Sequence, residues 1–148
     1  MTRTASASAV TTASPEQVFR HLAEAGAWPV WMRVPTRSRR ARSGAPDPDG
    51  VGAVRAIFPM RERVVAYEPP AHYAYVMETP MPIRDYRADV RLTPLDGGGT
   101  RIDWEARGGA VVPGTGALVG RTLGLLTRWL SGSLAEHASA CGGKCPVR

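Results

Sequence analysis

Two charged residues, Arg55 and Glu62, lie symmetrically about a short break in the segment VGAVRAIFPMRERVV at 51–65. Strand-forming residues flank the break on both sides, which is typical of a β-hairpin. If Phe58 and Pro59 form a two-residue loop, Arg55 and Glu62 are directly opposite each other across the hairpin. A guanidinium can polarise a ligand oxygen, and a carboxylate can accept a proton. The pair is therefore the candidate catalytic site.

The face of the sheet on which this pair lies determines its role. Ile57 shares the face of Arg55, and Val64 shares the face of Glu62. Both neighbours are branched and apolar, which favours the inward face, where a charged pair could orient a polar ligand group. The alternative is an exposed ion pair that contributes about 0.2 to 1 kcal/mol. Whether both side chains are buried distinguishes the inward pair from the exposed pair.

Alternation in the neighbouring segments predicts the walls of a ligand site. In RDYRADVRL at 84–92, charged residues occupy one face, which we expect to be solvated, and apolar residues occupy the buried face. The segments AHYAYVME at 71–78 and TRIDWEARG at 100–108 follow the same rule. The candidate ligand-binding residues are Tyr73, Tyr75, Met77, Tyr86 and Trp104 from these strands, with Leu126 from a C-terminal helix.

Two helical regions flank the strands. Ser14 is a good N-cap, Pro15 suits the first turn and Gln17 completes a capping box, so a helix should run to about Ala25. The segment GAWPVWM at 26–32 predicts a second short helix or turn, whose tryptophans either pack in the core or contact a ligand.

The longest helical pattern spans 115–139, with an apolar stripe on one face. Gly120, Gly124 and Gly132 interrupt it, and each costs roughly 1 kcal/mol relative to alanine. Such glycines indicate close packing, which we expect here, or space for another group.

These elements predict an α+β fold: a curved antiparallel sheet of six or seven strands around a long C-terminal helix, with two short helices after the first strand. We expect one domain over 1–140 and a flexible Gly/Cys tail at 141–148. One helix cannot close such a sheet completely, so an apolar cavity is expected between them.

The composition of the chain limits the classes of partner that we expect it to bind. The net charge of +6 comes from 18 arginines and a single lysine, and the basic run RSRRAR at 37–42 has no interleaved aromatic residue, so no nucleic-acid partner is expected. Cys141 and Cys145 form a C-x3-C pair without a second pair; we interpret them as structural or incidental thiols, with zinc as the alternative. The absence of a long apolar run or signal-like start predicts a cytoplasmic protein without stable membrane insertion.

The chain resembles the SRPBCC superfamily of START-like, helix-grip proteins, in its polyketide cyclase/dehydrase and lipid transport branch. The resemblance covers about residues 3–139 and rests on segments in a specific order. The resemblance implies a deep cavity for hydrophobic small molecules. Some members of the superfamily bind or carry lipids, and others cyclise and dehydrate polyketides. The segments are ASPEQVFRHLAEAGAWPVW, GVGAVR, ERVVAYEPPAHYAY, RDYRADVRLTP and GGTRIDW.

Three functions are compatible with these observations. In the first, the protein binds a hydrophobic molecule, such as a lipid or a polyketide, with Arg55 anchoring an oxygen-rich end. In the second, it is a cyclase or dehydratase that needs no cofactor and no metal, with Glu62 as the base. The adjacent guanidinium stabilises the carboxylate and weakens this hypothesis. The third function is that of a protein-interaction module with a filled cavity, or of a homodimer. His21, His72 and His137 lie in different elements and are not a promising catalytic set.

Overall fold

Strands with alternating buried and exposed residues form one sheet, and helices cover one of its faces. The computed structural model describes residues 2–141, and the strand order in the seven-stranded antiparallel sheet is β1-β7-β6-β5-β4-β3-β2. The strands are β1 (Thr2–Thr11), β2 (Ser38–Arg42), β3 (Val54–Ile57), β4 (Met60–Glu68), β5 (His72–Met77), β6 (Ile83–Pro94) and β7 (Thr100–Ala110). The helices are α1 (Pro15–Ala23), the 3-10 helix η1 (Ala25–Ala27), α2 (Trp28–Met32) and α3 (Gly116–Cys141). This arrangement confirms the predicted helix-grip fold.

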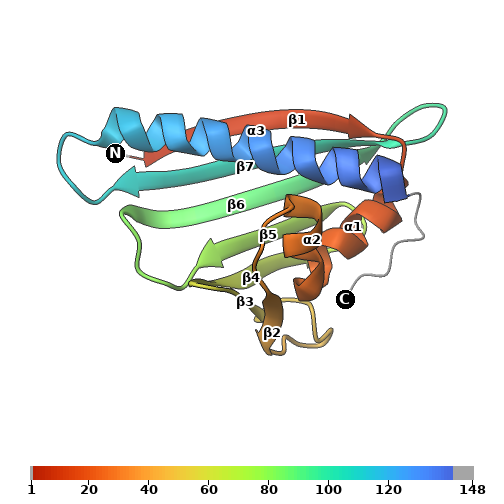
Figure 1. Ribbon diagram of the computed structural model, residues 1–148, viewed down its shortest axis with the longest axis horizontal. Coiled ribbons are helices and arrows are strands. Elements are labelled where there is room, and N and C mark those ends of the chain that lie inside the picture. Colours follow the sequence, from red (N-terminus) through yellow and green to blue (C-terminus); the bar gives the residue numbers. More distant parts are fainter. Residues whose placement is uncertain (1, 142–148) are drawn as a thin grey trace.

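The long helix α3 runs along β1 and β7, at one edge of the sheet (Figure 1). Small side chains make this approach possible, because Ala5, Ala7 and Ala9 alternate with exposed serines along β1. The buried residues of α3 recur with helical periodicity and include Val119, Leu123, Leu130 and Leu134. None of the helices in residues 2–141 combines the length and apolarity needed to cross a bilayer.

The first helix begins where the sequence predicts. The Ser14 side chain accepts a hydrogen bond from the Gln17 amide, and the Gln17 side chain accepts one from the Ser14 amide, which completes the capping box. The helix ends at Ala23, two residues before the predicted end. A hydrogen bond from Trp28 Nε1 to the Leu22 carbonyl at 2.9 Å satisfies an acceptor near this early end.

The expectation for α3 was wrong in two respects. The helix continues to Cys141, so that this residue ends a helix, and residues 142–148 of the predicted tail lie outside the described residues. The close packing expected at the glycines is also not observed at two of the three. A Cβ atom at Gly124 or Gly132 would meet nothing within 4 Å, whereas one at Gly120 would lie 3.8 Å from the Arg3 side chain. The alanines of β1 already provide the close approach between strand and helix, so α3 does not need glycines for it.

Candidate functional site

The hairpin of β3 and β4 has the predicted register. Arg55 is directly opposite Glu62, and Ile57 is opposite Met60, with Phe58 and Pro59 in the turn. Both charged side chains face inward: Arg55 is 3% exposed and Glu62 is 7% exposed. The hairpin therefore carries a buried charge pair on the covered face of the sheet.

Arg55 is the centre of the polar contacts in the core. Its Nη2 atom donates to Glu62 Oε2, and Nη1 donates to the Tyr73 hydroxyl at 3.0 Å. The guanidinium carbon lies 3.5 Å from the ring centroid of Trp28 and 5.1 Å from that of Tyr75, within cation–π range. Burial alone would lower the pKa of Arg55, but Glu62 and the two tyrosines more than compensate and raise it. The guanidinium is therefore charged at every physiological pH.

Three tyrosines extend this polar region along β5 and β6. Burial is the main cause that raises the pKa of Tyr73, Tyr75 and Tyr86 above the ordinary value. The rings of Tyr75 and Tyr86 contact each other, with their centroids 6.2 Å apart. All three phenols remain protonated near neutral pH, so they can donate hydrogen bonds but cannot act as bases.

Two buried donors in this core have no hydrogen-bond partner among the described residues. They are Arg55 Nε and Trp104 Nε1. The other two core tryptophans differ, because Trp28 Nε1 donates to Leu22 and Trp31 Nε1 donates to the His21 carbonyl at 3.1 Å. An unsatisfied buried donor costs about 1 to 3 kcal/mol, so the core of this protein contains two donors that an oxygen atom could stabilise.

Aromatic rings occupy much of the interior between the sheet and α3. The ring centroid of Trp104 lies 5.9 Å from that of Trp28 and 6.1 Å from that of Trp31. Trp28 also contacts Tyr75 edge to face at 5.6 Å. The space beside Arg55 and Tyr73 amounts to only about 10 Å³. A ligand in the core must therefore displace or rearrange some of these rings.

A larger groove of about 690 Å³ lies at the end of the sheet, where β5 leads into β6. Its apolar lining includes Met77, Met81, Ile83 and Tyr86. Since Tyr86 also contacts Tyr75, the groove is one ring away from the polar core. Its volume is that of a small-molecule site. The charged residues of the groove are Arg63, Glu78, Arg84, Asp85, Arg87 and Arg107.

The remaining candidate residues lie in or against the hydrophobic core. Trp104 is fully buried among the tryptophans, whereas Met77 and Leu126 are half-buried and pack against the core. The sequence predicts either core packing or ligand contact for Trp28. The structure places the Trp28 ring against the Arg55 guanidinium. The local sequence, in which Pro29 follows Trp28, does not predict this contact.

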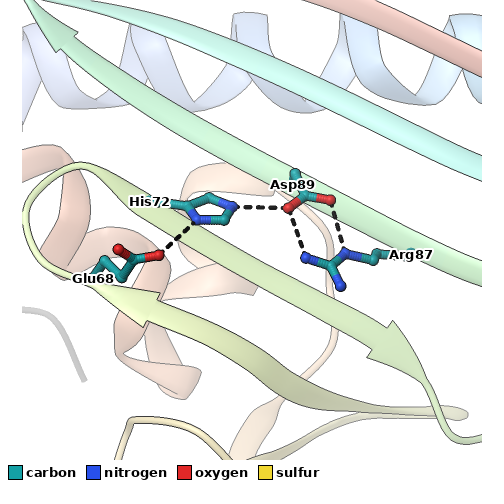
Figure 2. A network of polar contacts seen from close by, with 4 residues as sticks. All are labelled: Glu68, His72, Arg87 and Asp89. Atoms are coloured by element: carbon teal, nitrogen blue, oxygen red, sulfur yellow. Dashed lines mark hydrogen bonds and ion pairs between the residues drawn. The ribbon is translucent and has the colours of Figure 1, made fainter.

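The opposite face of the sheet carries a second polar network (Figure 2). His72 Nε2 lies 2.8 Å from Asp89 Oδ1, and Arg87 contacts the same carboxylate through two nitrogen atoms, at 2.9 and 3.0 Å. Burial would raise the pKa of Asp89, but the hydrogen bonds from Arg87 and His72 outweigh it and lower the pKa. Asp89 was predicted to be solvated and is in fact 8% exposed, because Arg87 and His72 cover it. Glu68 completes the network at 3.2 Å from His72 Nδ1.

Two of the histidines, His21 and His137, lie together although no local sequence pattern predicts their contact. The rings of His21 on α1 and His137 on α3 make an edge-to-face contact, with centroids 5.1 Å apart. Burial, His21 and Arg33 lower the pKa of His137. The two residues are 116 positions apart in the chain, so only the docking of α3 beside α1 brings them together.

The comparisons with known proteins agree with this fold. A START superfamily protein from Mycobacterium smegmatis has a TM-score of 0.74 at 14% identity, covering 93% of this chain and 97% of that one. The di-domain ARO/CYC protein BexL from the BE-7585A biosynthetic pathway has a TM-score of 0.79 at 18% identity. The match covers 94% of this chain and 47% of BexL. A solution structure from Thermobifida fusca has a TM-score of 0.67 at 23% identity, covering 93% of both chains.

These identities are below the level at which activity can be transferred, so the structures support the fold alone. No curated protein matches the sequence. The family model described as polyketide cyclase/dehydrase and lipid transport matches residues 2–139, nearly the whole chain. On this match, and with the helix-grip architecture described above, the chain belongs to the polyketide cyclase/dehydrase and lipid transport family.

Proposed function

We propose that this protein binds a hydrophobic small molecule, lipid-like or polyketide-like, that carries an oxygen-bearing polar group. The observation that carries the proposal is the pair of unsatisfied buried donors, Arg55 Nε and Trp104 Nε1. Leaving both donors without an acceptor opposes folding, whereas a ligand oxygen would satisfy them. The family description is consistent with such a ligand.

Each candidate residue has a distinct role in this proposal. Arg55 binds the polar group of the ligand, and Glu62 and Tyr73 hold its guanidinium in place. Tyr75 offers a protonated hydroxyl near the same position. The ligand enters through the groove at Met77 and Tyr86, and its apolar part contacts aliphatic and aromatic side chains. The wall residues are Met77, Tyr86, Trp104 and Leu126.

The experiment uses the purified protein in two steps. Native mass spectrometry followed by solvent extraction tests for a retained compound. The fluorescent probe 1-anilinonaphthalene-8-sulfonate, which combines aromatic rings with an anionic group, then measures affinity. Because a hydrogen bond to a charged group contributes about 1.5 to 3 kcal/mol, the double variant R55M/E62L should bind this probe roughly tenfold or more weakly than the wild type.

The single variant R101M is the matched control, since Arg101 lies on the outward face of β7, outside the groove, and pairs with Asp103. It should bind the probe as the wild type does. Equal effects of R55M/E62L and R101M would refute the role of Arg55. A protein that retains no compound and binds no probe would instead favour the alternative of a partner-binding module whose interior is filled by its own rings.

A cyclase or dehydratase is the second candidate function. The observation in its favour is the cluster of a charged guanidinium and protonated phenols, which can polarise a ketone and acidify the neighbouring carbon. Glu62 is the candidate base, but Arg55 already binds its carboxylate. The test supplies a poly-β-ketone and follows the absorbance of aromatic products. Product formation that is lost in Y75F and retained in R101M would establish the enzyme, whereas ligand retention without turnover would exclude it for that substrate.

A further inference from the structure

A mixed cluster of nitrogen and sulfur ligands lies where α1 meets the end of α3. His21 comes from α1, and His137 and Cys141 are four residues apart on α3, so both point to the same side of that helix. The ligand atoms of the three residues all lie within 4.8 Å of one another. His21 is buried, and the other two residues are half-buried. The cluster is thus shielded from bulk solvent but not enclosed.

The hydrogen bond of His21 favours metal ligation. Its Nδ1 atom lies 2.8 Å from the Gln17 carbonyl oxygen, and a carbonyl can only accept, so Nδ1 carries the proton. In the neutral ring the lone pair is then on Nε2. Histidines that bind metals typically donate their other ring N–H to a backbone carbonyl or carboxylate, which fixes the ring orientation. His21 already has this arrangement.

The redox state of Cys141 controls whether the cluster can bind a metal. Cys141 is disulfide-bonded in this structure, and a disulfide sulfur is not a thiolate ligand. Reduction by a cellular dithiol adds two electrons and two protons to the disulfide and yields two thiols, while the dithiol is oxidised to its own disulfide. The Cys141 thiol then loses its proton when its sulfur bonds to a metal ion.

We propose that His21, His137 and Cys141 bind a zinc-type divalent cation in the reduced protein, and that disulfide formation abolishes this site. Two imidazoles and one thiolate are a donor set typical of zinc. Tetrahedral zinc holds such ligand atoms roughly 3.3 to 3.6 Å apart, so side-chain shifts of about 1 Å would complete the geometry. A fourth position is left for water or another ligand. The site is separate from the polar core around Arg55.

The experiment titrates the reduced full-length protein with Co²⁺ and then with Zn²⁺. The wild type should bind one equivalent of Co²⁺ and show both the ligand-field bands of a tetrahedral ion and a thiolate-to-cobalt charge-transfer band. Zn²⁺ should displace the cobalt and raise the melting temperature. The oxidised protein should lack the charge-transfer band. H137Q should lower the affinity at least about tenfold, and C141S should remove the charge-transfer band.

Two control variants make the result decisive. H72Q removes a histidine on the opposite face of the sheet and should bind cobalt as the wild type does. C145S removes the second cysteine of the chain, and its charge-transfer band should persist, because Cys141 supplies the thiolate. Binding of less than one equivalent by folded, reduced protein would overturn the proposal. A charge-transfer band that survives in C141S, or unchanged affinity in H137Q, would also overturn it.

Discussion

Removing the carboxylate of Glu62 should destabilise the protein strongly, because it leaves the Arg55 guanidinium buried without a counter-charge. Arg55 is 3% exposed, so water cannot replace the lost partner. Breaking a buried ion pair in this way typically costs about 3 to 5 kcal/mol. The Tyr73 hydroxyl and the Trp28 ring remain in contact with the guanidinium. We therefore expect E62A to lose about 3 kcal/mol, at the lower end of that range.

Replacing both charges should cost much less than removing one. In the double variant R55M/E62L, two apolar side chains of similar volume occupy the same space, and neither needs a charged partner. Such replacements are often neutral or stabilising by about 1 to 4 kcal/mol. Tyr73 loses a hydrogen-bond partner, which offsets about 1 kcal/mol of any gain. The double variant should therefore lie within about 1 kcal/mol of the wild type.

Urea denaturation measures both effects. E62A should lower the midpoint at unchanged slope and lower the melting temperature by roughly 6 to 12 °C. E24A is the control: Glu24 forms an exposed pair with Arg20 at 3.6 Å, and its loss should cost no more than about 0.5 kcal/mol. If R55M/E62L is as unstable as E62A, uncompensated charge is not the cause of the instability, and the reasoning fails.

Three further variants test other parts of the fold. D89N should destabilise the protein by about 1 to 2 kcal/mol at pH 7, because Arg87 and His72 stabilise the charged form. These contacts lower the pKa of Asp89, so their contribution to stability is present above the unfolded pKa of about 4 and disappears as the pH falls through the lower folded value. The urea midpoints of the wild type and D89N should therefore converge in acid. A difference that stays constant with pH would refute this prediction. G99A should cost about 1 to 3 kcal/mol, since Gly99 has φ +92° and a Cβ would lie 2.6 Å from the Thr11 carbonyl oxygen; a midpoint equal to wild type would contradict it. S14A should cost about 1 kcal/mol through loss of the cap, and thermal melts would show no shift if the cap contributed nothing.

Local patterns were sufficient to predict the fold and the hairpin register. The two-residue turn fixed the pairing of Arg55 with Glu62, and the branched neighbours Ile57 and Val64 indicated the inward face. Both inferences depend on residues close together in the chain, where alternation and turn length restrict the outcome. The same approach found the capping box at Ser14.

Contacts between distant segments were not predictable in the same way. The approach of Trp28 to Arg55 depends on how α2 packs on the sheet, and the pairing of His21 with His137 depends on how α3 docks beside α1. The burial of Asp89 depends on a histidine from the neighbouring strand. No periodicity encodes these contacts, because each requires the tertiary arrangement of two elements.

The energetics of the core favour a functional reason for the Arg55 and Glu62 pair. A buried ion pair is weak support for stability, and this one leaves Arg55 Nε without a partner among the residues described. Apolar residues could fill the same volume at equal or lower cost, so packing alone gives no reason to place a guanidinium there. A ligand oxygen that accepts from Arg55 would offset the cost in the bound state. A stable R55M/E62L variant that no longer binds its ligand would separate the two roles, because the fold would be retained while recognition was lost.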